Sequence, residues 1–259
     1  MPRNVITSRA YTGVNVLLLW HAAQARGYER NEWLTFNQAC DIDAKVRKGA
    51  KGVMCVFYKR VERTAKSDAK GDEDGEGGMV PMLKPFWVFN VADIDGLPEQ
   101  PAPVLGEFQP VEEGEFILKA SGARVEYGGN RASYSPAADM IRLPQPEQFK
   151  SPANYYATAL HELVHWTGHE SRLSREYGKR FGDEAYAFEE LVAELGSAFV
   201  LADQGLSQYS IEGHASYLQS WLKVLKSDKT AIFTAAKHAS AAHALIVSHA
   251  GHEGEEAGA

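Results

Sequence analysis

Five consecutive residues, His161-Glu162-Leu163-Val164-His165, combine the residue types of a hydrolytic metal site. On a helix of 3.6 residues per turn, positions i and i+4 share a face, so His161 and His165 would direct two imidazoles at one point. That spacing is typical of zinc ligands, and Glu162 would lie within reach of a metal-bound water. The alternative is an amphipathic helix with two hydrogen-bonded surface histidines. We favour the metal site and predict Glu162 as its general base.

A catalytic zinc site needs three protein ligands and an open fourth position, so one ligand remains to be found. The candidates are His169, Glu170 and a carboxylate further along the chain. His169 continues the i+4 spacing, but three ligands stacked along one straight helix would bind an ion with awkward geometry. A related pattern places a third histidine at the position that is Ser171 here, which excludes that pattern.

Two carboxylates further downstream, Glu190 and Glu194, share one face of a predicted apolar helix. Carboxylates on a buried helix are costly unless a cation compensates them. We predict Glu190 as the third ligand and Glu194 as the group that orients a ligand imidazole through its second N–H. The reverse assignment stays open, and a solvated acidic face is the other alternative.

The predicted chemistry is hydrolysis of a peptide bond. Zinc would polarise the scissile carbonyl and lower the pKa of a bound water, while Glu162 would carry the proton to the leaving amine. Manganese or another divalent metal is an alternative to zinc. His214 and Tyr217, one helical turn apart, are candidates for stabilising the oxyanion, although packing is the ordinary role of such residues.

The formal charge is unevenly distributed along the chain. The 259 residues carry a net charge of −7. Residues 1–66 hold 12 Lys and Arg against 5 Asp and Glu, a balance of +7, whereas residues 67–259 hold 15 against 29, a balance of −14. This asymmetry suggests that the first segment binds a polyanion and that the second has a different role.

Cationic side chains gather in two stretches of the first segment, alternating with aromatic residues. The predicted DNA contacts are Lys45, Arg47, Lys48 and Lys51 in a glycine-containing turn, and Lys59 and Arg60 at the end of a strand. This composition suits single-stranded DNA, because cations follow phosphates while rings stack on bases. Most rings of so small a domain would nevertheless belong to its core. Because no helix-turn-helix or zinc-knuckle pattern occurs, binding should be independent of DNA sequence.

Two domains of mixed helix and strand, an α+β fold, would position these groups. For the first domain, residues 1–97, we predict helices at Gly13–Arg26 and Asn37–Ala44 and strands at Val53–Tyr58 and Phe86–Val91. The packed face of the first helix would carry Val14, Leu17, Leu18 and Ala22. Residues 66–78 contain no aliphatic side chain larger than alanine and are predicted to form a disordered loop.

A proline-rich linker, residues 98–107, would lead to the second domain, residues 108–250. Ser151, Pro152 and Gly168 are typical of the two ends of a helix that carries the histidines. The other predicted elements are strands at Arg124–Tyr127, Arg131–Tyr134 and Met140–Leu143, and helices near Ala185–Gln204, Glu212–Lys226 and Lys229–Ser248. The tail Gly251–Ala259 is predicted to fray.

The remaining features indicate a reduced, cytoplasmic protein. No apolar run is long enough to span a membrane, and the N-terminus lacks the apolar core of a signal peptide. Only two cysteines occur, Cys40 and Cys55, and they do not form a CxxC motif.

Several stretches resemble the ArdC-type antirestriction proteins and the related TraC-type plasmid primases. In the first domain these are Thr12–Leu17, Trp33–Ala39, Val46–Gly52 and Phe86–Val91; in the second they are His161–Leu173 and Ala187–Leu195. The resemblance covers nearly the whole chain apart from the acidic loop and the last residues. Because the chain ends after the peptidase-like domain, primase activity is not implied.

The resemblance implies a non-specific DNA-binding domain that prefers single strands, joined to a Glu-zincin-like metallopeptidase domain. It further implies that the protein protects incoming plasmid DNA from host restriction during conjugation. Two alternatives stay open. One is an active protease that degrades proteins bound or crosslinked to DNA, and the other is a binding module in which the metal is structural. A restriction enzyme is one possible protein substrate.

Overall fold

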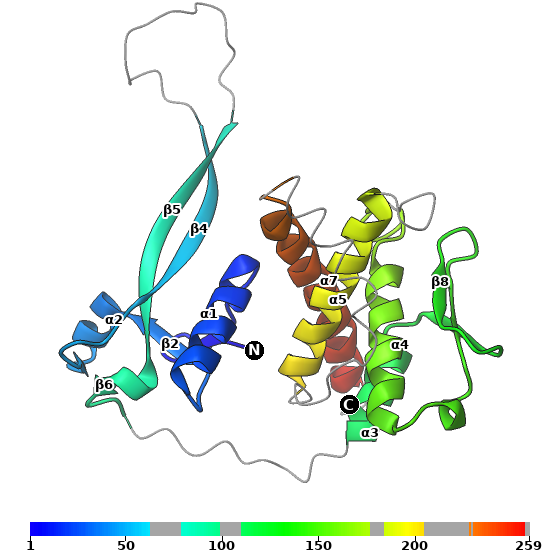
Figure 1. Ribbon diagram of the computed structural model, residues 1–259, viewed down its shortest axis with the longest axis horizontal. Helices are drawn as coiled ribbons and strands as arrows, with labels where there is room; N and C mark the ends of the chain where they lie inside the picture. The colour runs from blue at the N-terminus through cyan, green and yellow to red at the C-terminus, as the bar shows by residue number, and fades with distance from the viewer. Residues whose placement is uncertain (63–78, 99–109, 177–183, 205–227, 229, 257–259) are drawn as a thin grey trace, which may run out of the picture. The chain divides into compact units, whose positions relative to one another are not determined.

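The computed structural model describes residues 1–62, 79–98, 110–176, 184–204, 228 and 230–256. The chain forms two compact units. The N-terminal unit comprises Pro2–Tyr11 and Asn15–Gln100, and the C-terminal unit comprises Met1, Thr12–Val14 and Pro101–Ala259. Both contain helices and strands (Figure 1), which confirms the predicted α+β class. In the part of the chain that the structure describes, no helix is long and apolar enough to cross a membrane.

A four-stranded sheet in the order β1-β2-β5-β4 forms the centre of the N-terminal unit. Its strands are β1 (Arg3–Asn4), β2 (Glu32–Thr35), β4 (Val53–Glu62) and β5 (Met79–Asn90). β1 pairs in parallel with β2, and the other pairs are antiparallel. β4 and β5 form the long twisted hairpin of Figure 1, in register from Val53 opposite Val88 to Glu62 opposite Met79. Both strands extend further than predicted.

The two faces of this sheet are covered by different helices. Trp33 and Leu34 are neighbours in β2, and because side chains alternate along a strand they point to opposite faces. Trp33 packs with Leu19 of helix α1 (Val14–Arg26), whereas Leu34 packs with Ala39 of helix α2 (Phe36–Asp41). The short strands β3 (Lys45–Val46) and β6 (Ile94–Asp95) pair beside α2, with the 3₁₀ turn η1 (Val91–Asp93) before β6.

The packed face predicted for α1 is wrong in part. The buried side chains are those of Val16, Leu19, Ala22 and Ala23, so only Ala22 is common to both sets. The run Val16–Trp20 is apolar at every position, and it therefore offers an apolar residue on each side of the helix. Periodicity alone cannot choose the buried side of such a segment.

The C-terminal unit packs helices against a three-stranded sheet in the order β7-β9-β8. The strands are β7 (Arg124–Tyr127), β8 (Ser133–Ser135) and β9 (Met140–Leu143), followed by the 3₁₀ turn η2 (Pro146–Gln148). The helices are α3 (Pro110–Ala120), α4 (Pro152–Thr167), α5 (Glu184–Asp203) and α7 (Ala231–Glu256). The predicted fraying from Gly251 is wrong as far as Glu256, because extending an existing helix is far easier than nucleating one.

Helix α4 carries the HExxH motif and begins and ends at the residues expected from the sequence. Ser151 caps its first turn by accepting a hydrogen bond from the backbone N–H of Asn154, Pro152 is in the first turn, and Gly168 is the C-cap. Helix α5 lies close against α4 (Figure 1). A Cβ atom added at Gly196 of α5 would lie 2.8 Å from Cγ1 of Val164, so the absence of a side chain there permits the close approach.

Candidate metal centre

His161 and His165 of α4 and Glu190 of α5 form one cluster, in which a ligand atom from each residue lies within 4.8 Å of the others. The Nε2 atoms of the two histidines are 3.2 Å apart. Glu190 places Oε2 3.5 Å from Nε2 of His161 and Oε1 3.6 Å from Nε2 of His165. The structure thus brings together the three residues predicted as ligands, while their role in binding metal stays a prediction.

The spacing of these atoms fits a small divalent cation. Ligands at about 2.0–2.1 Å from a tetrahedral zinc ion lie about 3.3 Å from one another, close to the three separations in the cluster. The surrounding charge also fits. Glu162, Glu189, Glu190 and Glu194 are four mostly buried carboxylates, and Arg175 is the one buried arginine beside them among the described residues. A bound cation would reduce this excess of negative charge.

Each histidine directs its second ring nitrogen at a carboxylate of α5. Nδ1 of His161 lies 3.5 Å from Oε1 of Glu194, and Nδ1 of His165 lies 3.2 Å from Oε1 of Glu189. Carboxylates in this position fix the orientation and tautomer of a ligand imidazole. Glu194 therefore lies where its predicted role requires, whereas the corresponding role of Glu189 was missed by the sequence analysis.

Arg175 holds Glu189 in place. Its Nε donates to Oε2 at 3.0 Å and its Nη2 to Oε1 at 2.8 Å, and both side chains are almost completely buried. The remaining donors of Arg175 reach the Thr167 hydroxyl at 2.9 Å and the Val164 carbonyl at 2.7 Å. Burial raises the pKa of Glu189, but the hydrogen bonds from His165 and Arg175 outweigh it and hold the pKa below its usual value. Glu189 thus stays ionised.

The ionisation of the cluster itself follows from burial and close charges. Burial alone would lower the pKa of His161, but hydrogen bonding to Glu190 and the charges of Glu162 and Glu194 raise it to about 9. Burial would raise the pKa of Glu190, yet its hydrogen bond to His161 and the nearby histidines keep it low. In the absence of a metal, His161 and Glu190 would therefore form an ion pair at neutral pH.

Glu162, the predicted base, is 8% exposed and follows the first histidine on α4. Burial raises the pKa of its carboxyl group, and the charges of the two histidines oppose that effect. The carboxylate also accepts a hydrogen bond from the backbone N–H of Tyr134 in β8. A buried carboxylate with a raised pKa beside a metal cluster suits proton transfer.

Side-chain contacts of the loop after α4 link β8 to this helix. Arg172 pairs with both carboxylate oxygens of Asp139, and its guanidinium lies 3.8 Å from the ring centroid of Trp166. The hydroxyl of Tyr134 donates to Asp139 at 2.7 Å. This network holds the strand that carries the Tyr134 backbone next to Glu162.

The other candidates lie apart from the cluster or outside the description. His169 is half-buried, with its Nδ1 2.8 Å from the Ser171 hydroxyl, and Glu170 is exposed. His214 and Tyr217, with the helix predicted near Glu212–Lys226, lie outside the described residues. The same holds for residues 66–78 and for most of the predicted linker.

The predicted DNA contacts occupy varied positions. Lys48 and Lys51 are exposed, and so is Lys45, although it lies in β3 and not in a turn as expected. Arg47 donates to Asp95 at 2.8 Å, which raises the pKa of Arg47 and lowers that of Asp95, but this pair is exposed. Lys59 and Arg60 lie in the far part of β4, where the side chains are outside the description. Trp33 is core, as expected for most rings.

Several large apolar side chains of the N-terminal unit are exposed. They are Phe36, Met54, Phe57, Leu83 and Trp87, each at least half exposed. Nothing in the sequence distinguishes Trp87 from a packed ring, because an aromatic residue in a strand usually lies against a core. Trp87 and Phe89 lie on the same face of the hairpin. Trp87 is exposed because α2 covers this face only at the end that carries Phe89.

The fold and the cluster together define a two-unit protein with a zincin-like metallopeptidase domain. A family model described as zincin-like metallopeptidase matches residues 112–238. A second, described as the N-terminal domain of anti-restriction factor ArdC, matches residues 1–89. The chain belongs to the ArdC antirestriction family, which confirms the resemblance noted in the sequence.

Solved structures support this assignment over most of the chain. The metal-free crystal structure of the antirestriction ArdC protein from the R388 plasmid is similar to this chain, with a TM-score of 0.80 and 39% identity. The similarity covers 97% of this chain and 89% of that protein. The Mn(II)-bound structure of the same protein gives a TM-score of 0.79 and 40% identity, covering 96% and 88%. That relative therefore binds a divalent metal.

Curated relatives include an uncharacterised protein, y4eC, of Sinorhizobium fredii (strain NBRC 101917 / NGR234), 42% identical over 239 residues. These residues make up 92% of this chain and 78% of y4eC. A DNA primase TraC of Escherichia coli is 40% identical over 258 residues, which cover 95% of this chain but only 18% of TraC. The chain thus spans a small part of that primase.

Proposed function

We propose that this protein binds single-stranded DNA without sequence preference through its N-terminal unit, and that it thereby protects incoming plasmid DNA from restriction during conjugation. Membership of the ArdC family and the positive balance of residues 1–66 support the proposal. Its two cysteines are unpaired, as suits action in the cytoplasm. The observation that carries the proposal is an exposed apolar face on the β4–β5 hairpin, close in sequence to the exposed Lys51.

Trp87, Met54 and Leu83 make up this Trp87 face. Met54 lies directly opposite Trp87 in the register. Leu83 precedes Trp87 by four residues and therefore points to the same side of β5. Trp87 is 53% exposed, and Gly52 lies against its side chain, with the exposed Lys51 next in sequence. A ring for base stacking beside an ammonium for a phosphate is the arrangement typical of single-strand binding.

The test is the affinity of the full chain for a short single-stranded oligonucleotide. Trp87→Ala should weaken binding about tenfold, because loss of one base-stacking ring costs about 1–3 kcal/mol. Phe57→Ala is the matched control, since Phe57 is as exposed but points to the opposite face of the hairpin. Equal effects of the two substitutions would contradict the proposed face. An affinity insensitive to salt would contradict phosphate binding.

For the C-terminal unit we propose a divalent metal, zinc or manganese, held by His161, His165 and Glu190. Glu194 and Glu189 would orient the two imidazoles, because they lie 3.5 Å and 3.2 Å from the second ring nitrogens of His161 and His165. When bound, such an ion would supply Lewis acidity and lower the pKa of a water ligand. Glu162 would accept the proton, held in place by the backbone N–H of Tyr134.

Proteolysis of DNA-bound proteins is the second candidate function. The burial of Glu162 and its raised pKa favour it, because a purely structural metal site has no use for a base at that position. Glu162→Gln removes the base while leaving all proposed ligands in place. If the variant still protects plasmid DNA from restriction as well as the parent does, protection does not depend on proteolysis. Loss of protection with intact DNA binding would support the protease.

A further inference from the structure

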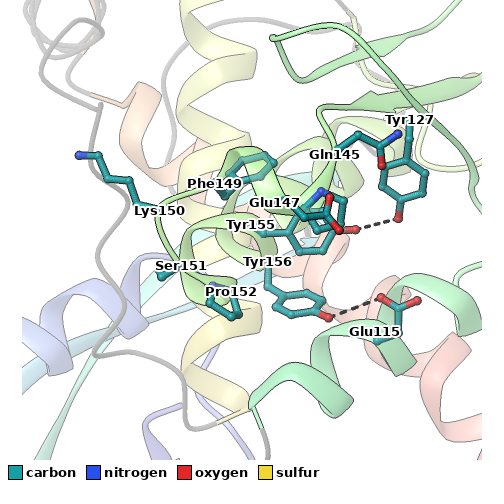
Figure 2. Close-up of a pocket in the computed structure, with 11 residues that line it drawn as sticks. Glu115, Tyr127, Gln145, Glu147, Phe149, Lys150, Ser151, Pro152, Tyr155 and Tyr156 are labelled. Atoms are coloured by element: carbon teal, nitrogen blue, oxygen red, sulfur yellow. Dashed lines mark hydrogen bonds between the residues drawn. The ribbon is translucent and has the colours of Figure 1, made fainter.

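A pocket of about 650 Å³ lies at the N-terminal end of α4, among α3, the end of β7 and η2 (Figure 2). It is separate from the metal cluster, since Tyr155 in its wall precedes His161 by six residues, about 9 Å along the helix axis. Four aromatic rings and two carboxylates line it: Tyr127, Phe149, Tyr155, Tyr156, Glu115 and Glu147. We call it the tyrosine pocket.

The rings of the tyrosine pocket are fixed by packing. Tyr155 makes edge-to-face contacts with Phe149, at 5.4 Å between ring centroids, and with Tyr156, at 4.8 Å. Tyr155 and Tyr156 are almost fully buried in the core of the unit. Tyr156 also lies directly against Gly114 of α3, where an added Cβ would be 2.4 Å from the ring. The ring walls are therefore formed before any ligand arrives.

The polar atoms of the pocket favour a ligand that donates hydrogen bonds. The hydroxyls of Tyr127 and Tyr155 are 2.8 Å apart, so one phenol proton is used between them. The Tyr156 hydroxyl faces the Glu115 carboxylate at 3.5 Å, as Figure 2 shows. Glu147, on the rim, adds a second carboxylate. Acceptor oxygens therefore outnumber the available phenol protons.

The charges around the tyrosine pocket favour a cation. Lys119 pairs with Glu115 at 3.5 Å, but both side chains of this pair are substantially exposed, so the pairing is weak. Lys150 also belongs to the lining, yet its ammonium group points away from the rings in Figure 2. The more accessible rings, those of Tyr127 and Phe149, are electron-rich and lie beside carboxylates, so they attract cations and repel phosphates.

From these observations we infer that the tyrosine pocket binds an arginine side chain of a protein partner. Arginine fits better than lysine, because its planar guanidinium stacks on aromatic faces while its five N–H donors can bridge the carboxylates and phenol oxygens. A nucleic acid does not suit the pocket, since its phosphates would face Glu115 and Glu147. The inference does not rest on the proposed function, because it involves neither DNA nor the metal cluster.

The test compares two tripeptides that differ only in charge, acetyl-Gly-Arg-Gly-amide and its neutral isostere with citrulline in place of arginine. Binding to the full chain is followed by NMR shifts of the tyrosine and phenylalanine ring signals. The arginine peptide should bind at least about tenfold tighter than the citrulline peptide, and free spermidine should compete less well than the arginine peptide. Single-stranded DNA should not displace it.

Variants assign the binding to this pocket. Glu147→Gln and Tyr127→Leu alter exposed or half-exposed side chains, so the fold should persist. Each substitution should lower the affinity for the arginine peptide several-fold. Glu170→Gln, an equally exposed change outside the lining, is the control. The inference is overturned if the two peptides bind equally, if Glu147→Gln behaves like Glu170→Gln, or if no saturation is seen up to about 10 mM peptide.

Discussion

The same chemical pair, an arginine with a carboxylate, occurs in both units in opposite surroundings. Arg47 and Asp95 of the N-terminal unit are 56% and 62% exposed, whereas Arg175 and Glu189 of the C-terminal unit are 3% and 4% exposed. The exposed pair can exchange its partner for water or phosphate at little cost. The buried pair cannot, because each charge depends on the other. The Arg47 guanidinium thus remains available to an incoming anion, whereas the Arg175 guanidinium is held in place beside the metal cluster.

The largest expected effect comes from breaking the buried pair. Arg175→Met leaves Glu189 buried without its main partner, and loss of one partner of a buried pair costs about 3–5 kcal/mol. The free energy of unfolding, measured in urea, should fall by that order. The corresponding exposed change, Arg47→Met, should leave it unchanged within error. A similar loss in both variants would contradict the comparison.

A smaller loss is expected when the two helices of the metal cluster are forced apart. Gly196→Ala adds a methyl group 2.8 Å from Val164, and overpacking of this kind costs about 1–3 kcal/mol. Because α5 carries Glu190, metal affinity should fall together with stability. Gly251→Ala in α7 is the matched control, since nothing lies within 4 Å of its added methyl group. If the control destabilises equally, helix separation is not the cause.

Replacing Glu189 should lower the metal affinity even though this residue is not a proposed ligand. Glu189→Gln keeps the shape of the side chain but removes the charge that orients His165. Loss of such a carboxylate typically weakens metal binding about 10- to 100-fold. Competition with a chelating indicator measures the change. Unaltered affinity would show that Arg175 and Glu189 serve stability alone.

The smallest effect concerns the N-terminal unit, where the two thiols report on folding. Burial raises the pKa of Cys55 to about 12, whereas Cys40 is exposed. At pH 8 a thiol reagent should therefore modify Cys40 quickly and Cys55 only after unfolding. Arg175→Met should not accelerate labelling of Cys55 in dilute buffer. Rapid labelling of Cys55 in that variant would show that the two units do not unfold independently.

The features that depend on local sequence pattern were predicted well. The caps at Ser151 and Gly168, the strands β7 and β9 and the i+4 histidines all follow from short-range rules. The features that depend on contacts between residues distant in sequence were predicted poorly. Glu189 and Arg175 meet although 14 residues separate them, and nothing in the pattern distinguishes Glu189 from a solvated acid. The buried side of α1 was predicted only in part, because the run Val16–Trp20 is apolar at every position.

Metal content in matched variants shows whether His161, His165 and Glu190 bind a divalent ion and whether Glu162 takes part in binding it. The measurement is elemental analysis of purified parent, Glu162→Gln, Glu190→Gln and Glu194→Gln proteins. We expect about one ion per chain in the parent and in Glu162→Gln, and loss of the ion in Glu190→Gln but not in Glu194→Gln. Full metal content in Glu190→Gln, or its loss in Glu162→Gln, would show that the ligands are assigned wrongly.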